Sequence, residues 1–267
     1  MDQKEMEGLL IKMLDAVRPQ LQADGGDAEF IRLEGNVATV KMVGSCGTCP
    51  FAMMTLKNTI ETKFKELNPE IVVRRAIDTM NVSLVGVGGQ GILLTAELLA
   101  RAAAIEGLDV KKSEIHGMSQ RGGSVVSSVR FGEKVYSPII PEGQSDILVA
   151  FDRLEALRWG HVLKPGGRAL LNKLDIEPIT VTSGQQKPVE NFEDRLKEAI
   201  PLAYYIDALD IAKKIGNERT MNMVIAGALS KFTPFSVDSW ISALTERLPE
   251  KLVEVNLVAF AQGRNSL

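Results

Sequence analysis

The chain has 267 residues, with 31 Lys and Arg against 34 Asp and Glu, which gives a formal net charge of −3. This balance argues against a nucleic-acid-binding protein, whose contact surface is normally basic. No apolar run approaches the roughly 20 residues that a membrane span needs. The first ten residues, MDQKEMEGLL, are charged and amphipathic, so we expect no secretory signal and a cytoplasmic protein. Only two cysteines are present, which favours a metal or redox site over a disulfide framework.

The first 76 residues predict a small α+β domain. Apolar residues recur at helical spacing up to Val17, and the tandem glycines of Asp24–Asp27 then end that helix. Two strands are expected at Phe30–Leu33 and Val37–Val43, with a turn between them. The segment GSCGTCP follows, then a second helix and a short strand at Ile71–Val73. The expected order is therefore α-β-β-α-β.

Residues 77–267 predict a separate α/β domain. A β-rich run at Val82–Val85 flows into GVGGQG and then into a helical pattern. Further strands are expected near 108–110, 147–151, 169–172 and 204–206, with helical segments between several of them. Alternating strands and helices indicate a largely parallel sheet covered on both faces.

The two cysteines, Cys46 and Cys49, form a CxxC pair directly before Pro50. Proline is favoured at the first position of a helix, so the pair is expected at a helix N-terminus. Unpaired N–H groups and the helix dipole lower thiolate pKa values there, which helps both metal ligation and redox chemistry.

Counting ligands limits what this pair can bind. Zinc and [4Fe–4S] sites usually take four protein ligands, and His116 and His161 fall in the other predicted domain. The simplest solution is a cluster shared by two copies of the domain. A thioredoxin-like dithiol, a zinc site bridging a dimer and a pair without a role are the other interpretations of the spacing alone.

The surrounding residues narrow this choice. The segments VRPQLQADGGDAEF and VKMVGSCGTCPFAMMTLKNTIETKFKELNPEI closely resemble the NifU C-terminal-like (Nfu) iron–sulfur scaffold domain. The resemblance implies that Cys46 and Cys49 are metal ligands, that two chains share a [4Fe–4S] cluster in a homodimer contact, and that the cluster is passed to other proteins.

Two glycine-rich segments stand out in the second predicted domain. The first comprises Gly86, Gly88, Gly89, Gln90 and Gly91 between a strand and a helix, a context in which glycines let a phosphate approach a helix N-terminus. The acidic residue expected for NAD(P) binding has no clean match, because Asp109 comes early and Glu114 late. The second segment, Ser119, Gln120, Arg121, Gly122 and Gly123, is a plausible anion cradle. Glycines that only pack a helix onto a sheet, and a surface Arg121, are the alternatives.

The region 80–263 resembles the gamma-type domain of 2-oxoacid:ferredoxin oxidoreductases, through GVGGQG together with HGMSQRGGS. It looks most like the beta subunit of indolepyruvate:ferredoxin oxidoreductase. The resemblance implies a Rossmann-like fold and a place in an enzyme that converts 2-oxoacids to acyl-CoA and reduces ferredoxin.

The sequence lacks a thiamine-diphosphate motif and a run of four cysteines, and no residue stands in a complete catalytic constellation. We therefore expect no catalytic residue here, and a partner subunit that carries thiamine diphosphate and helps bind coenzyme A. The isolated chain should be inactive. A non-enzymatic iron–sulfur carrier that docks to oxidoreductases, and an NAD(P)-dependent reductase using CxxC as a redox pair, are the alternatives.

Overall fold

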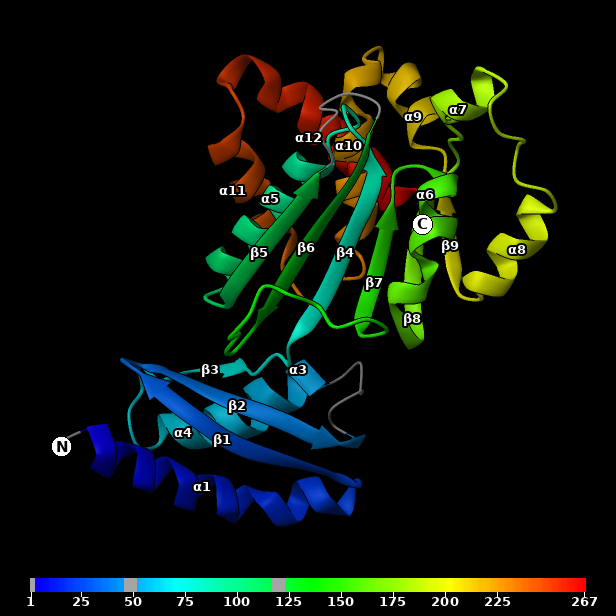
Figure 1. Cartoon of the computed structure of the whole chain (residues 1–267). Coiled ribbons are helices and arrows are strands. Elements are labelled where there is room, and N and C mark those ends of the chain that lie inside the picture. The colour runs from blue at the N-terminus through cyan, green and yellow to red at the C-terminus, as the bar shows by residue number, and fades with distance from the viewer. Residues whose placement is uncertain (1–2, 46–51, 117–122) are drawn as a thin grey trace. The chain divides into compact units, whose positions relative to one another are not determined.

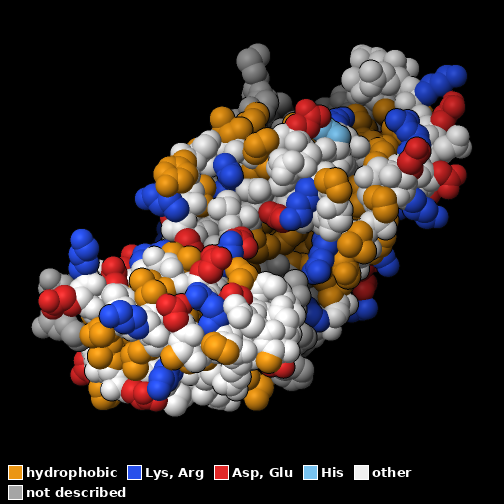
Figure 2. All heavy atoms as spheres, turned by 90° about the horizontal axis from the view of Figure 1, so that it is seen from below, with side chains coloured by type: hydrophobic (Ala, Val, Ile, Leu, Met, Phe, Trp, Pro, Cys, Tyr) orange, Lys and Arg blue, Asp and Glu red, His pale blue; other side chains and the backbone are white. Residues whose placement is uncertain are grey.

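The computed structural model describes residues 3–45, 52–116 and 123–267. The chain divides into two compact units, Met1–Asp78 (unit 1) and Thr79–Leu267 (unit 2), shown in Figure 1. Among the described residues, no helix has both the length and the apolarity that crossing a membrane requires. On the face drawn in Figure 2, acidic and basic side chains are interspersed.

Unit 1 is a three-stranded sheet with helices. Its strands lie in the order β1-β2-β3, where β1 and β2 are antiparallel and β2 and β3 are parallel. The two-residue loop between Glu34 and Val37 joins the hairpin. The elements are α1 (Gln3–Ala23), β1 (Gly26–Glu34), β2 (Val37–Gly44), α3 (Ala52–Thr55), the π-helical η1 (Leu56–Glu61), α4 (Thr62–Lys65) and β3 (Val72–Arg75).

The core of unit 1 lies between its helices and one face of its sheet. Leu10, Leu14 and Val17 of α1 are buried against the sheet residues Ala28 and Val40. From the helical stretch after the cysteines, the side chains of Leu56, Ile60 and Phe64 are fully buried in the same cluster. The spacing of four residues between them places all three on one side of the helix.

Unit 2 is built on a six-stranded sheet in the order β5-β6-β4-β7-β8-β9. The pairs β4–β7, β7–β8 and β8–β9 are parallel, while β6 runs antiparallel to β4 and β5. The prediction of a small domain followed by an α/β domain with a mostly parallel sheet is confirmed. The strands are β4 (Met80–Val87), β5 (Asp109–His116), β6 (Ser124–Gly132), β7 (Ser145–Ala150), β8 (Leu163–Asn172) and β9 (Ala203–Ile206).

Helices cover both faces of this sheet. In Figure 1, α6 lies in front of the sheet, where it packs with α8 over Val85, Leu148 and Leu171. Helices α5, α10, α11 and α12 lie behind it. The helices are α5 (Ile92–Ile105), α6 (Arg153–Trp159), the short η2 (Gly160–Val162), α7 (Ile179–Thr182), α8 (Phe192–Ala199), α9 (Ala208–Ile215), the short η3 (Glu218–Thr220), α10 (Met221–Leu229), α11 (Val237–Arg247) and α12 (Glu250–Asn265).

The buried helix α10 crosses α12 at very short range. A Cβ added at Gly227 would lie 1.9 Å from the carbonyl oxygen of Phe260, and one added at Gly263 would lie 1.9 Å from that of Val224. Both distances are far below van der Waals contact, so only glycine fits at this crossing. The crossing fixes α10 against α12.

We expect Gly227→Ala to destabilise unit 2 strongly, because the methyl group has no space in this backbone-to-backbone contact. Overpacking of this kind should lower the unfolding free energy by about 3 kcal/mol. The matched control is Gly8→Ala on the exposed face of α1, where a Cβ meets nothing within 4 Å and alanine should stabilise its helix. Denaturant unfolding of both variants tests this, and equal stability of the Gly227 variant and the wild type would contradict it.

Candidate functional site

The end of β2 in unit 1 is anchored to the glycine turn that follows α1. The Ser45 N–H donates to the carbonyl oxygen of Gly25 at 3.0 Å, and the Ser45 hydroxyl donates to that of Asp24 at 2.7 Å. Gly44 has a φ of 63°, and a Cβ on it would lie 2.6 Å from the Gly25 oxygen. The Asp-Gly-Gly-Asp break therefore fixes the residue directly before Cys46.

Asp27 holds this turn to α1. Its carboxylate accepts hydrogen bonds from its neighbour's backbone N–H at Ala28 (2.7 Å), from Arg18 Nε (2.9 Å) and from Gln22 Nε2 (3.1 Å). The backbone N–H of Ala28, with the Gln22 and Arg18 side chains, lowers the pKa of the Asp27 carboxyl. Arg18 also donates to the Ala28 carbonyl oxygen at 3.0 Å, so one arginine ties the helix to the strand twice.

The predicted metal ligands Cys46 and Cys49 lie outside the described residues. Within the described part of the chain, no group of three or more His, Cys, Asp or Glu side chains could hold a metal ion. Two thiols per chain suit an iron–sulfur cluster only if further ligands come from another chain.

In unit 2, the first glycine segment turns from β4 into α5, as its sequence context predicts. Gly89 and Gly91 have φ values of 103° and 87°, a left-handed backbone that favours glycine. A Cβ on Gly91 would lie 2.5 Å from Nδ2 of Asn222, so α10 packs directly against this residue. The N-cap of α5 is therefore a glycine, and no side chain caps the helix.

Gln90 braces this turn from within. Its Oε1 accepts from the Val87 N–H at 2.6 Å, and its Nε2 donates to the Phe151 carbonyl oxygen at 3.3 Å. The side chain thus links the ends of β4 and β7, the parallel neighbours at which the connections diverge to opposite sides. Such a switch point is where ligands bind in open α/β sheets.

The structure brings one residue of the second segment to the first. The N–H of Gly88 donates to the carbonyl oxygen of Gly123 at 2.8 Å, directly before β6 begins. The other four predicted residues, Ser119, Gln120, Arg121 and Gly122, lie outside the described residues, as does the side chain of His116. Gly123 therefore contacts the first glycine segment at the carboxyl edge of β4.

A cavity of about 720 Å³ opens beside this edge. Its charged groups occur in pairs: Arg247 Nε lies 2.8 Å from Glu97, and Lys112 Nζ lies 2.7 Å from Glu114. The hydrogen bond from Arg247 lowers the pKa of Glu97. The cavity is lined by Gly88, Gly89, Gly91, Ile92, Leu93, Leu94, Glu97, Lys112, Glu114, Val125 and Arg247.

Two buried polar residues stabilise the neighbouring strand ends. Asp152 accepts from the N–H groups of Leu154, Glu155 and Ile176, and burial raises the pKa of its carboxyl. Asn172 donates to the Phe151 carbonyl oxygen and accepts from the Ala208 N–H. Their hydrogen bonds are used within the fold, so both residues position the loops.

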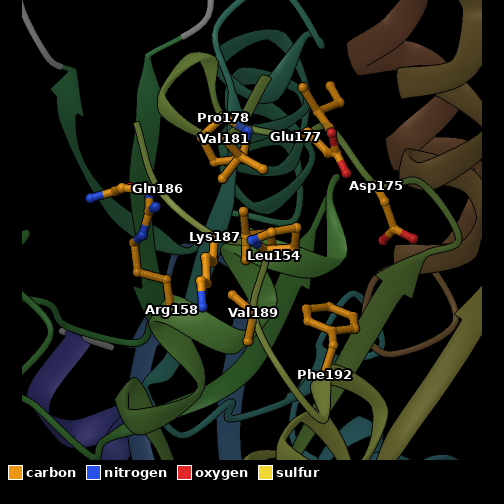
Figure 3. A pocket seen from close by; sticks show the side chains of 12 residues that line it. Leu154, Arg158, Asp175, Glu177, Pro178, Val181, Gln186, Lys187, Val189 and Phe192 are labelled. Atoms are coloured by element: carbon orange, nitrogen blue, oxygen red, sulfur yellow. The ribbon is translucent and has the colours of Figure 1, made fainter. Parts of the chain in front are cut away.

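A second cavity, of about 300 Å³, lies where the segment after β8 passes over α6. Figure 3 shows Arg158 and Gln186 on one side of it and Asp175 and Glu177 on the other. Leu154, Pro178, Val181, Val189 and Phe192 make much of the remaining wall. Asp175 is bound by Arg153 and Arg158 by Glu155, so these two charged groups of the cavity are paired within the fold.

Sequence reasoning missed several elements of this edge. The strand β6 was not expected. Its sequence SVVSSVRF nevertheless has Val125, Ser127 and Val129 at every second position, and all three are buried. Asp152 carries a readable signal, since an aspartate before a helical run is a typical N-cap. No sequence signal identified Asn222, because it contacts Gly91 although the two residues are 131 positions apart in the chain.

The lowered pKa of Asp27 predicts a pH-dependent stability of unit 1. A folded-state pKa below the unfolded value means that the stabilisation is complete above the unfolded pKa, near 3.9, and is lost as pH falls through the folded value. Asp27→Asn should therefore lower the unfolding free energy of unit 1 by about 1 kcal/mol at pH 7. The difference from wild type should vanish in strong acid.

The matched control is Asp24→Asn, an exposed carboxylate in the same turn whose side chain makes no hydrogen bond to the described residues. Urea unfolding at a series of pH values measures both variants. A gap between wild type and Asp27→Asn that stays constant from pH 7 to pH 2 would refute the assignment.

Two family models match the chain. Residues 81–266 match the pyruvate ferredoxin/flavodoxin oxidoreductase family, and residues 11–74 match the NifU-like domain. The indolepyruvate oxidoreductase subunit IorB of Archaeoglobus fulgidus is 40% identical over 190 residues, which cover 70% of this chain and 94% of that protein. The chloroplastic NifU-like protein 2 of Arabidopsis thaliana is 43% identical over 65 residues, which cover 24% of this chain and 28% of that protein.

Solved structures agree with these matches. The gamma subunit of a keto/oxoacid ferredoxin oxidoreductase from Geobacter sulfurreducens superimposes with a TM-score of 0.52 at 25% identity, covering 70% of this chain and 96% of that one. The 2-oxoglutarate:ferredoxin oxidoreductase of Magnetococcus marinus, solved with 2-oxoglutarate, coenzyme A and succinyl-CoA bound, gives 0.56 at 25% identity, covering 71% and 31%. The chain therefore belongs to the pyruvate ferredoxin/flavodoxin oxidoreductase family, as an oxidoreductase subunit that carries a NifU-like iron–sulfur domain before its α/β domain.

Proposed function

We propose that residues 77–267 form the gamma-type subunit domain of an indolepyruvate-type, arylpyruvate-oxidising 2-oxoacid:ferredoxin oxidoreductase. The similarity to IorB proteins covers nearly the whole length of those relatives, and it supports this substrate class. A second subunit would bind thiamine diphosphate and perform the decarboxylation, with electrons passing to ferredoxin.

The role of this chain's own residues in that enzyme is binding and positioning. In the described part of the chain, the carboxylates at the carboxyl edge of the sheet are engaged: Asp152 by three backbone N–H groups, Glu97 by two arginines. These contacts support a positioning role for both carboxylates. The residues proposed to bind a phosphate-bearing cofactor such as coenzyme A are the glycine segments 86–91 and 119–123.

For residues 1–76, we propose a carrier domain whose cargo is a [4Fe–4S] cluster held by Cys46 and Cys49 of two chains. The matches to NifU-type proteins support this role, and the hydrogen bonds of Ser45 hold the residue directly before Cys46. A cluster bound by only two cysteines per chain at a chain boundary is suited to release. The domain would then deliver clusters to the partner oxidoreductase in the cytoplasm.

The most direct test of the enzyme assignment is to isolate the native complex, identify the partner chain and assay a panel of 2-oxoacids. We expect coenzyme A-dependent ferredoxin reduction that is fastest with indolepyruvate or another arylpyruvate. Reduction fastest with pyruvate or 2-oxoglutarate would overturn the substrate class. A chain that co-purifies only with varied cluster-containing clients, without a thiamine subunit, would favour a non-enzymatic carrier instead.

The cluster assignment predicts the effect of Cys46→Ser. After reconstitution with iron and sulfide under anaerobic conditions, the wild-type chain should show iron–sulfur absorption and dimerise, and the variant should lose both. Thr48→Ser, between the two cysteines, is the matched control and should retain both. Cluster absorption that is equal in the Cys46 variant and the wild type would rule out this ligand.

A further inference from the structure

The N-terminus of α5 has no side-chain cap in the structure. Its N-cap residue is Gly91, and its first turn contains no acidic residue. The first four N–H groups of a helix lack partners within the helix, and together with the helix dipole they favour an anion. Three other helices of unit 2 have a side-chain N-cap: Asp152 caps α6, Asp207 caps α9 and Ser236 caps α11.

A buried amide lies directly beside this helix end. Asn222 belongs to the first turn of α10, is only 8% exposed, and places Nδ2 within 2.5 Å of where a Gly91 Cβ would stand. The backbone of Asn222 is held, because its carbonyl oxygen accepts from the Thr95 hydroxyl at 3.4 Å. The side-chain amide, in contrast, makes no hydrogen bond to any residue that the structure describes.

Asn222 is not completely sealed from solvent, since 8% of the residue remains exposed. A nearly buried amide without a hydrogen-bond partner in the protein costs desolvation free energy unless water or a ligand binds to it. The Asn222 amide is thus a donor without a partner among the described residues, next to the uncapped N–H groups of the α5 N-terminus.

The charges nearby do not oppose an anion. Of the two carboxylates that line the adjoining cavity, Glu97 is bound by Arg101 and Arg247, and Glu114 by Lys112. Their negative charge is offset by these cations. A doubly charged group at the start of α5 would therefore gain from the helix end without facing an unpaired carboxylate of the cavity.

We propose that Asn222 is a ligand-binding residue of unit 2. Its side-chain N–H and the backbone N–H groups at the start of α5 together bind a phosphate group of a nucleotide-type ligand. This inference rests on the proposed function, because it specifies which atoms of the chain bind the phosphate-bearing cofactor. It also explains why residue 91 is glycine, since any side chain there would displace the Asn222 amide.

The test is isothermal titration of the full-length chain with three separate probes: coenzyme A, ADP and inorganic pyrophosphate. We expect binding of at least one probe, weakened roughly ten-fold or more by Asn222→Asp, which replaces a donor by a negative charge at the helix end. Asn222→Ala removes only the donor and should weaken binding less. Binding of pyrophosphate alone would identify the free anion as ligand, and binding of coenzyme A or ADP the nucleotide.

The matched control is Asn256→Asp on α12, an equally buried asparagine whose amide donates to the Leu252 carbonyl oxygen of its own helix. It makes the same change of charge, and its affinity should stay within two-fold of wild type. Thermal unfolding checks that each variant is folded. If Asn222→Asp does not fold, the affinity of Asn222→Ala tests the inference instead.

Three outcomes would overturn the inference: a wild-type chain that binds none of the probes, equal affinity of wild type and both Asn222 variants, or equal losses at positions 222 and 256. A native complex that still oxidises 2-oxoacids in any of these cases would leave the proposed function standing.

Discussion

The contact between Gly91 and Asn222 is the constraint on which the carboxyl edge of unit 2 depends. It joins the turn after β4 to α10, a helix that is distant in sequence. Helix α10 is in turn fixed against α12 by the crossing at Gly227 and Gly263, where a side chain would overlap a backbone carbonyl. The start of α5 is therefore positioned by a series of backbone contacts that tolerate no added methyl group, which is the rigidity that a binding surface needs.

Unit 1 uses the same principle at a smaller scale. Gly44 approaches the Gly25 carbonyl oxygen too closely for a Cβ, and Ser45 adds two hydrogen bonds to the same turn. Asp27 and Arg18 then hold the turn against α1. The glycine pair after the first helix thus fixes the end of β2, directly before the segment that contains Cys46 and Cys49.

Local features of the fold were predictable because local residues determine them. The tight turn after Glu34 and the buried face formed by Leu56, Ile60 and Phe64 depend on spacing that can be read along the chain. The strand–glycine–helix context of Gly86–Gly91 was predictable for the same reason, and the structure confirms it. In contrast, β6 escaped prediction, and its insertion between β4 and β5 makes one strand of the sheet antiparallel.

The partners of these features could not be read from the sequence. Asn222 contacts Gly91 only because α10 is folded back over the start of α5, and Gln90 is used in bracing β4 to β7 rather than left open for a ligand. Such contacts depend on tertiary packing, for which a single sequence carries no periodic signal.

We propose that the chain joins an oxidoreductase subunit to a domain that supplies clusters to that enzyme. The most direct measurement loads the full-length chain with a ⁵⁷Fe-labelled cluster, mixes it with partner subunit stripped of its clusters, and separates the two under anaerobic conditions. Mössbauer spectra should then show labelled [4Fe–4S] cluster on the partner, together with restored ferredoxin reduction. Label that remains entirely on this chain while the partner stays inactive would contradict the account.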